Sequence, residues 1–361
     1  VGKTSTREAV FAVLSSRYRV RRSEKNYNTE IGVPLTVLGL PHYGRNALGW
    51  LWGIGRAWAR AALYSPGYPE ILVLEMGADR PGDIGYLTKI APPLVGVVTA
   101  IGETPVHVEF FAGPGEVAEE KANLVAVLPP EGHAVLNGDD VAVLGIRGRT
   151  RARVLTFGFR KEATVRIQRY ELDAAGHPPG IRFGLAGNGE VATVMLKNTF
   201  GRQQAYAAAA AACVGLAFRM RLGEIARALG RYESPPGRLK VLRANKGALI
   251  LDDTYNASPV ATLAALEVLA EFPARRRIAV LGDMLELGQY TEEAHRLVGE
   301  KAAAVADIFI GVGERMKFAL NEASRGSHRP EVRWFATSRE AGGELDRLLR
   351  PGDVILVKGS Q

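Results

Sequence analysis

Residues 247–253, GALILDD, form an apolar run that ends in two aspartates, and four similar runs follow it. They are RIAVLGD at 277–283, DIFIGVG at 307–313, VRWFA at 332–336 and DVILVKG at 353–359. Stretches with helical periodicity separate them, near residues 259–271, 291–305, 315–323 and 338–349. Alternation of strands and helices is typical of a parallel sheet with helices on both faces. The pattern therefore predicts a doubly wound, Rossmann-like α/β domain at the C-terminal end.

A second α/β region precedes this domain. The apolar runs EILVLEMG at 70–77 and LVGVVTAIG at 94–102 predict buried parallel strands. Between about 151 and 197, short strand-forming runs separated by turn residues predict a small, mostly antiparallel β insert. Helices are expected over 202–218 and 222–230, after which Pro235, Pro236 and Gly237 break the chain. We therefore expect one domain over residues 1–233 and a second over residues 237–361.

The composition is that of a folded globular protein, with 47% hydrophobic and 23% charged residues. The net charge of +8 suits an anionic ligand such as a nucleotide. A nucleic-acid-binding protein is the competing interpretation of that charge, but the basic residues are scattered and no zinc-ligand spacing occurs. The single cysteine, Cys213, excludes a disulfide within the chain and favours a reducing compartment such as the cytoplasm.

The stretch ALGWLWGIGRAWARAALY at 47–64 is apolar and rich in tryptophan, but Arg56 and Arg60 interrupt it. It is too short and too charged to span a bilayer. Its spacing predicts an amphipathic helix packed against a core, and no membrane insertion is expected.

The chain begins VGKTST, in which Gly2, Lys3 and Thr4 match the last part of a phosphate-binding loop. In such a loop, backbone N–H groups at a helix N-terminus hold phosphate oxygens, the lysine reaches the outer phosphates and the hydroxyl ligates Mg²⁺. The first glycine of the loop and the strand before it do not precede Gly2 in this sequence. A frayed N-terminus is therefore the alternative interpretation.

Several other polar residues follow apolar strands. Glu75 ends one expected strand, where a carboxylate can hold Mg²⁺ or cap the next helix. His107 follows the next strand, and Lys121 comes fourteen residues later on an expected helix, where a solvated lysine is the ordinary interpretation. Arg238 lies just past the proline-containing hinge, and its planar guanidinium suits a phosphate. The polar residues of DDTYNASP at 252–259 either cap a helix or contact a ribose.

The order of these fragments resembles the Mur ligases over nearly the whole chain. The fragments are GKTS at 2–5, LEMGADRPGDI at 74–84, LNGDD at 136–140, PPGRLKV at 235–241, DDTYNASP at 252–259, VLGDMLELG at 280–288 and GDVILVKGS at 352–360. The likeness is greatest to those members that add D-alanyl-D-alanine to UDP-N-acetylmuramoyl-tripeptide. It implies a P-loop central ATPase domain with a β insert, followed by a Rossmann-like domain. A MurE-like or folylpolyglutamate-type ligase, or a P-loop ATPase without ligase activity, is the alternative.

The resemblance also implies an activity. The expected reaction is ATP-dependent amide-bond formation through an acyl phosphate, in peptidoglycan precursor synthesis, by a cytoplasmic monomer that needs Mg²⁺. Such ligases also carry an N-terminal domain that binds the UDP-sugar, so the chain is expected to be N-terminally truncated.

Carried over residue by residue, the resemblance implies two groups of roles. Gly2, Lys3 and Ser5 would hold ATP phosphates, while Thr4, Glu75 and His107 would hold magnesium. Lys121 matches a lysine that several Mur ligases carbamylate with CO₂, which would give an anion near the metal. Arg238 would contact the γ-phosphate, and Asp253, Tyr255 and Asn256 would contact the nucleoside. Gln204, in the pair that replaces the usual His-Asn, would contact the adenine, and Asn28 and Thr29 would lie near the substrate.

Overall fold

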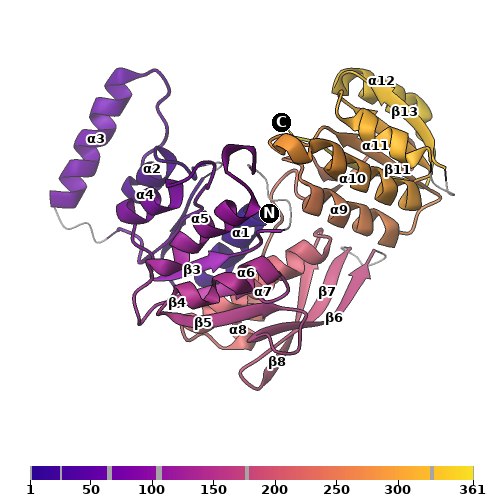
Figure 1. Cartoon of the computed structure of the whole chain (residues 1–361). Helices are drawn as coiled ribbons and strands as arrows, with labels where there is room; N and C mark the ends of the chain where they lie inside the picture. The colour runs from indigo at the N-terminus through magenta and orange to yellow at the C-terminus, as the bar shows by residue number, and fades with distance from the viewer. Residues whose placement is uncertain are drawn as a thin grey trace.

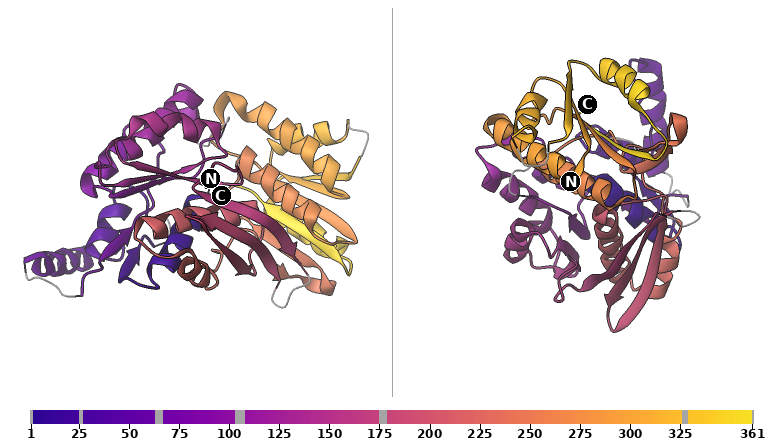
Figure 2. Two further views of the ribbon diagram at one scale, coloured as in Figure 1. Left: turned by 90° about the horizontal axis from the view of Figure 1, so that it is seen from below. Right: turned by 90° about the vertical axis from the view of Figure 1, so that its right-hand side faces the viewer.

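The computed structural model describes residues 2–24, 27–62, 67–102, 108–174, 179–325 and 329–360. These residues form two α/β bodies in sequence order, a middle domain and a C-terminal domain (Figure 1). Helix α3 (Ala47–Ala62) extends from the middle domain at the end of the molecule far from the C-terminal domain (Figures 1 and 2).

The middle domain is built on a six-stranded sheet in the order β3-β4-β5-β6-β7-β8. Strands β3 to β6 run parallel to one another, whereas β7 is antiparallel to both of its neighbours, β6 and β8. The strands are β3 (Val95–Val98), β4 (His133–Asn137), β5 (Arg153–Gly158), β6 (Val165–Asp173), β7 (Gly180–Gly187) and β8 (Glu190–Lys197). The antiparallel part confirms the expected β strands near 163–197. The strand at 153–158, however, pairs in parallel with β4 and β6, so the expected insert is an extension of the main sheet.

Helices cover both faces of this sheet. On one face α1 (Lys3–Leu14) and α8 (Leu222–Leu229) pack around the alanine-rich α7 (Arg202–Ala217), whose small side chains let the helices approach closely. On the other face lie α5 (Pro114–Ala126) and α6 (Val141–Gly145). A separate two-stranded parallel pair, β1 (Val20–Arg22) with β2 (Ile71–Val73), is half-buried. The remaining elements are the helices α2 (Gly32–Leu38) and α4 (Asp83–Ile90) and the short 3₁₀ helices η1 (Val108–Phe110) and η2 (Ile146–Arg149).

The C-terminal domain confirms the doubly wound prediction. Its sheet has the order β13-β12-β11-β14-β10-β9, with only the edge strand β9 antiparallel. The strands are β9 (Lys240–Arg243), β10 (Leu249–Asp253), β11 (Arg276–Gly282), β12 (Ile308–Val312), β13 (Glu331–Phe335) and β14 (Asp353–Lys358). One face carries α9 (Pro259–Glu271), α10 (Thr291–Val305) and α11 (Met316–Ala323), and the other carries α12 (Ser338–Leu348). Two short turns, η3 (Asn245–Gly247) and η4 (Gly288–Tyr290), complete the domain.

Helix α3 forms where the sequence predicts it, but the expectation that it packs on a core holds only for the narrow side that carries Ala57, which lies in a small cluster with Leu35 and Leu40. Within its described side chains, Ala57 is buried while both Trp52 and Trp58 are exposed. No helix among the described residues is long and apolar enough to cross a membrane.

Candidate active site

The N-terminus of α1 carries the residues of the expected phosphate loop. Gly2 caps the helix with a left-handed backbone (φ 80°), and its carbonyl accepts a hydrogen bond from the Thr6 N–H at 2.9 Å. Thr4 and Ser5 are buried in the first turn. The first N–H groups of a helix have no partner within it, so this turn presents donors and a positive dipole end to an anion.

Glu75 lies against this turn, in agreement with its expected place at the end of a strand. One carboxylate oxygen accepts a hydrogen bond from the Thr4 hydroxyl at 3.4 Å, and the other pairs with Arg7 Nη1 at 3.2 Å. Its own N–H donates to the Ser23 hydroxyl at 3.2 Å. A buried hydroxyl and a buried carboxylate therefore share one small site, with an arginine that balances the negative charge.

These two oxygen ligands fit Mg²⁺, a hard cation that takes few protein ligands and completes its shell with water and phosphate. Within the described residues, no cluster of three or more His, Cys, Asp or Glu side chains forms a metal cage. His107, the third expected ligand, lies outside the described residues.

Glu75→Gln is expected to raise the Mg²⁺ concentration for half-maximal activity by about tenfold or more, because a neutral amide binds the cation less tightly than a carboxylate. A Mg²⁺ titration of ATP turnover measures this. Glu119→Gln, which removes an exposed ion pair with Arg149, is the matched control. If the Mg²⁺ titration of Glu75→Gln were unchanged, Glu75 would not be a Mg²⁺ ligand, and its role would be the ion pair with Arg7.

Arg238 approaches the same turn from the start of the C-terminal domain. Its Nη2 atom lies 3.5 Å from the Thr4 hydroxyl, and its guanidinium carbon lies 4.1 Å from the ring centroid of Tyr255. Burial lowers the pKa of the guanidinium, and the nearby carboxylate of Asp253 opposes that shift. The buried Nε atom has no hydrogen-bond partner among the described residues. An unsatisfied buried donor on a half-buried cation, next to a phosphate-loop hydroxyl, suits a ligand oxygen.

The backbone of Gly237 sets the position of Arg238. Its φ is +69°, its N–H donates to an Asp252 carboxylate oxygen at 3.2 Å, and its carbonyl accepts from the Tyr255 N–H at 3.2 Å. A Cβ at this position would lie 2.9 Å from the Tyr255 backbone nitrogen. Both the left-handed conformation and the close approach therefore require glycine.

Gly237→Ala is expected to lower the free energy of unfolding by about 1–2 kcal/mol, the usual cost of a left-handed alanine. Chemical denaturation followed by circular dichroism measures it. Gly342→Ala is the control, because its Cβ would meet nothing within 4 Å on α12. If the two variants had equal free energies of unfolding, the left-handed backbone at residue 237 would not require glycine.

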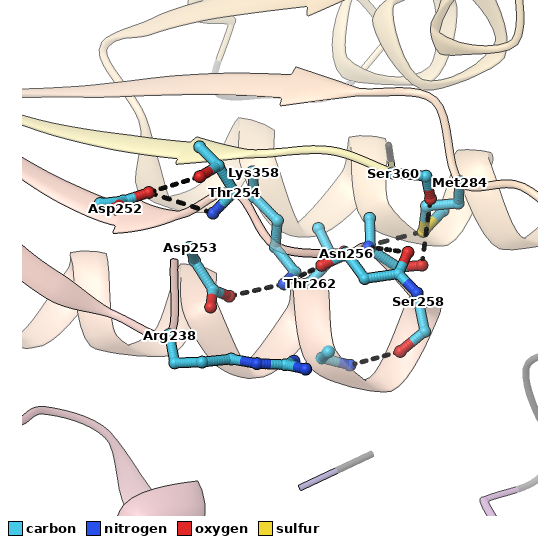
Figure 3. Close-up of polar contacts among 12 residues, drawn as sticks. Arg238, Asp252, Asp253, Thr254, Asn256, Ser258, Thr262, Met284, Lys358 and Ser360 are labelled. Carbon is cyan, nitrogen blue, oxygen red and sulfur yellow. Dashed lines mark hydrogen bonds and ion pairs between the residues drawn. The ribbon is translucent and has the colours of Figure 1, made fainter. Parts of the chain in front are cut away.

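Asp253 is held by Lys358, which lies at the end of the neighbouring strand (Figure 3). Lys358 Nζ donates to the carboxylate at 2.5 Å and to the Asn256 carbonyl at 2.9 Å. Burial raises the pKa of Asp253 and lowers that of Lys358, and the charge of each partner opposes the shift of the other. This buried pair fixes the loop that carries Tyr255 and Asn256 beside Arg238.

Lys121 is not the solvated lysine that its acidic neighbours suggest. Its ammonium donates to the Ala100 carbonyl at 3.4 Å, and burial, helped by the charge of Lys3, lowers its pKa to about 8 while Asp140 opposes the shift. Lys121 and Lys3 are therefore close enough to interact, although a long stretch of sequence separates them.

Comparison with known proteins gives a consistent result. Residues 60–215 match the Mur ligase middle domain, and residues 237–361 match the Mur ligase glutamate ligase domain. A UDP-N-acetylmuramoyl-tripeptide–D-alanyl-D-alanine ligase of Synechocystis is 30% identical and aligns with 100% of this chain and 70% of its own length. The enzyme of that name from Mycobacterium tuberculosis is 32% identical over 99% of this chain and 68% of its own. The chain belongs to the Mur ligase family.

Solved Mur ligase structures share the fold. MurF from Acinetobacter baumannii superposes with a TM-score of 0.82 at 26% identity, covering 100% of this chain and 72% of the other. MurF from Thermotoga maritima in complex with ADP gives 0.80 at 28% identity, with 100% and 74% covered. A nucleotide site is therefore expected in a Mur ligase with this architecture.

In this Mur ligase the Gln204 amide contacts the chain segment that leads into the C-terminal domain. Its oxygen accepts from the Tyr232 hydroxyl at 2.7 Å, and its nitrogen donates to the Ser234 hydroxyl at 3.1 Å and the Arg238 carbonyl at 3.3 Å. These bonds connect α7 to the hinge. The adenine contact implied for Gln204 stays a prediction.

Asn28 and Thr29 line a pocket together with Gly77, Asp79 and Asp83. The Gly77 N–H donates to the Asn28 carbonyl at 2.7 Å, which holds this pocket next to the strand end that carries Glu75. The expected position near the substrate is compatible with this placement and stays a prediction.

Sequence reasoning missed four residues of the candidate site, namely Arg7, Tyr232, Ser234 and Lys358. Arg7 pairs with Glu75, and its place three residues after Thr4, on the same helix face, was the available signal. Tyr232 and Ser234 hold Gln204, but both lie in a stretch that sequence analysis treats only as a domain boundary. Lys358 lies in a recognised motif, VKGS, without a role assigned to it.

Proposed function

We propose that this chain contains the ATP-binding and amine-adding part of a ligase that joins D-alanyl-D-alanine to UDP-N-acetylmuramoyl-tripeptide. The relatives with that name align with nearly the whole chain. The single structural observation that carries the proposal is the contact of Arg238, in the C-terminal domain, with Thr4 in the phosphate loop. This contact joins the two domains at the phosphate loop, which supports a shared site for a triphosphate.

The chemistry follows from the need to activate a carboxylate before an amine can attack it in water. An oxygen of the tripeptide carboxylate attacks the γ-phosphorus of ATP, and the bond to the β,γ-bridging oxygen breaks, so that an acyl phosphate and ADP form. The free amine of D-alanyl-D-alanine then attacks the acyl carbon. The carbon–oxygen bond to phosphate breaks, the nitrogen loses a proton, and an amide and inorganic phosphate result.

Lys3 and Arg238 would act on the first step. Both are cations that can approach the transferring phosphoryl group, and the stabilisation of its charge is the main source of rate in such reactions. Tyr255 stacks on Arg238 and would orient the guanidinium. Closure of the C-terminal domain about the hinge at Gly237 would exclude water from the acyl phosphate.

Thr4, Glu75 and His107 are the residues that would hold Mg²⁺, which would supply positive charge to the phosphates. Carbamylation of Lys121 would add an anion to this site, and its lowered pKa supports the proposal because CO₂ reacts with a neutral amine. Gly2 and Ser5 would bind phosphate through the first turn of α1, and Asp253 and Asn256 would bind the nucleoside.

The division into residues 1–233 and 237–361 is part of the proposal, and the family match that begins at 237 supports it. The matched relatives are longer, since this chain covers 68–72% of several of them. Their additional length is where we would place a UDP-sugar-binding domain. The cytoplasmic location and the monomeric state stay predictions.

Two measurements test the function. ATP binding is measured by calorimetry with the chain alone, and ADP release is measured with both substrates and with each omitted in turn. We expect ADP release to depend on UDP-N-acetylmuramoyl-tripeptide, and an amide product only when D-alanyl-D-alanine is also present. Steady ATP turnover without the peptide substrates would instead assign the chain to ATPases without ligase activity.

A further inference from the structure

Helix α3 exposes an apolar face that nothing in the described chain covers. Leu48, Leu51 and Trp58 are 78%, 70% and 75% exposed, and Trp52 and Ile54 are 61% and 56% exposed. At 100° per residue these five side chains occupy one continuous side of the helix. A monomeric protein rarely leaves such a continuous set of large apolar side chains in water without a binding role.

The opposite side of α3 is fixed to the protein. Ala57 is buried against Leu35 and Leu40, and the Trp50 ring packs edge-on against Tyr43 with centroids 5.5 Å apart. A Cβ on Gly53 would lie 2.7 Å from the Tyr43 ring, so the absence of a side chain there permits this packing. This packing fixes α3, which lies at the end of the molecule far from the C-terminal domain (Figures 1 and 2), and leaves the five apolar side chains in solvent.

The segment of sequence that carries this face has charges of one sign. No aspartate or glutamate occurs between Glu30 and Glu70, whereas Arg45, Arg56 and Arg60 do. The Arg56 guanidinium lies 5.2 Å from the Trp52 ring centroid, so a cation borders the apolar face directly. A second copy of this surface would bring arginines against arginines, which disfavours self-association through it.

We propose that α3 is an interfacial helix that binds the surface of an anionic phospholipid bilayer. Exposed tryptophan and leucine beside arginine, without acidic residues, is the composition of helices that lie in the headgroup region. Its 16 residues span about 24 Å, enough to lie along the membrane plane and too short to cross the bilayer. This proposal is independent of the proposed ligase activity. It concerns binding to the membrane surface, so the expected absence of membrane insertion then applies only to segments that would span the bilayer.

The test is co-sedimentation of the full chain with phosphatidylcholine vesicles, with and without ~30% phosphatidylglycerol, an anionic lipid. We expect binding to the anionic vesicles that weakens as salt is raised. The double variant Trp52→Glu, Trp58→Glu should lower the bound fraction by roughly tenfold or more, because it removes apolar burial and repels anionic lipid. The control is the double variant Val191→Glu, Leu297→Glu, which adds the same two negative charges at exposed apolar positions on β8 and α10.

Nucleotide affinity of the double variant, measured beside the control, shows that it remains folded. Equal binding of the α3 variant and the control to anionic vesicles would overturn the proposal. Absence of vesicle binding by the unmodified chain would also overturn it. If sedimentation equilibrium then showed a dimer that the double variant abolishes, the face would be assigned to self-association instead.

Discussion

Lys3→Ala is expected to lower the rate of ATP-dependent ligation by ~10²- to 10³-fold, the usual cost of one electrostatic contact to a transition state. Lys3 is the first residue of α1, beside the buried Thr4 that contacts both Glu75 and Arg238. In the proposed mechanism, loss of its ammonium would leave only Arg238 and Mg²⁺ to stabilise the charge of the transferring phosphoryl group. Initial rates of ADP release at saturating ATP measure the effect.

Lys89→Ala is the matched control, since Lys89 is an exposed lysine in the last turn of α4. An exposed surface substitution changes stability by less than about 0.5 kcal/mol, so this variant should retain its activity. Retention of more than about half of the rate by Lys3→Ala would remove Lys3 from the site.

Lys121→Ala is expected to lose ~10²-fold or more of the activity if the lysine acts as a carbamate, because the site then loses an anion. A small carboxylic acid such as acetate should restore part of the rate. Lys121→Arg retains a cation but cannot be carbamylated, and it should be as inactive as the alanine variant. Steady-state turnover with and without acetate measures both effects.

The pH dependence gives an independent test. With a pKa of about 8, the Lys121 amine is mostly protonated below that pH and mostly neutral above it. Activation by added bicarbonate of protein prepared without CO₂ should therefore increase from about pH 7 to about pH 9. If Lys121→Ala turned over normally, Lys121 would have no role in catalysis, and its hydrogen bond with the Ala100 carbonyl would be structural.

The C-terminal domain could be predicted almost completely from the sequence. The expected helices at 259–271 and 291–305 coincide with α9 and α10, because helical stretches alternate there with apolar strands, and because the Ser258 cap and Pro259 mark the start of α9. Strand β9 was not predicted, since it is a short edge strand directly after the hinge. Its pairing with β10 depends on a turn, including the left-handed Lys246, that local composition does not reveal.

Some members of the candidate site could be predicted from the sequence, but most of its contacts could not. Motif order identifies Lys3, Glu75 and Arg238, whereas their partners come from distant parts of the chain. The Arg7–Glu75 pair and the Lys121 environment arise only when strands and helices meet. For helix α3, the periodicity of the sequence predicts an apolar face, but it does not tell whether the rest of the protein covers that face.

The position of β14 has a consequence for the order of assembly during synthesis. This strand pairs with β10 on one side and β11 on the other, so the middle of the C-terminal sheet is made from its last described strand. In a nascent chain, β10 and β11 therefore lack their shared native neighbour until β14 has been synthesised. Lys358 arrives with it, so the buried partner of Asp253 is among the last side chains available. A prematurely released chain would lack both the central strand and this ion pair.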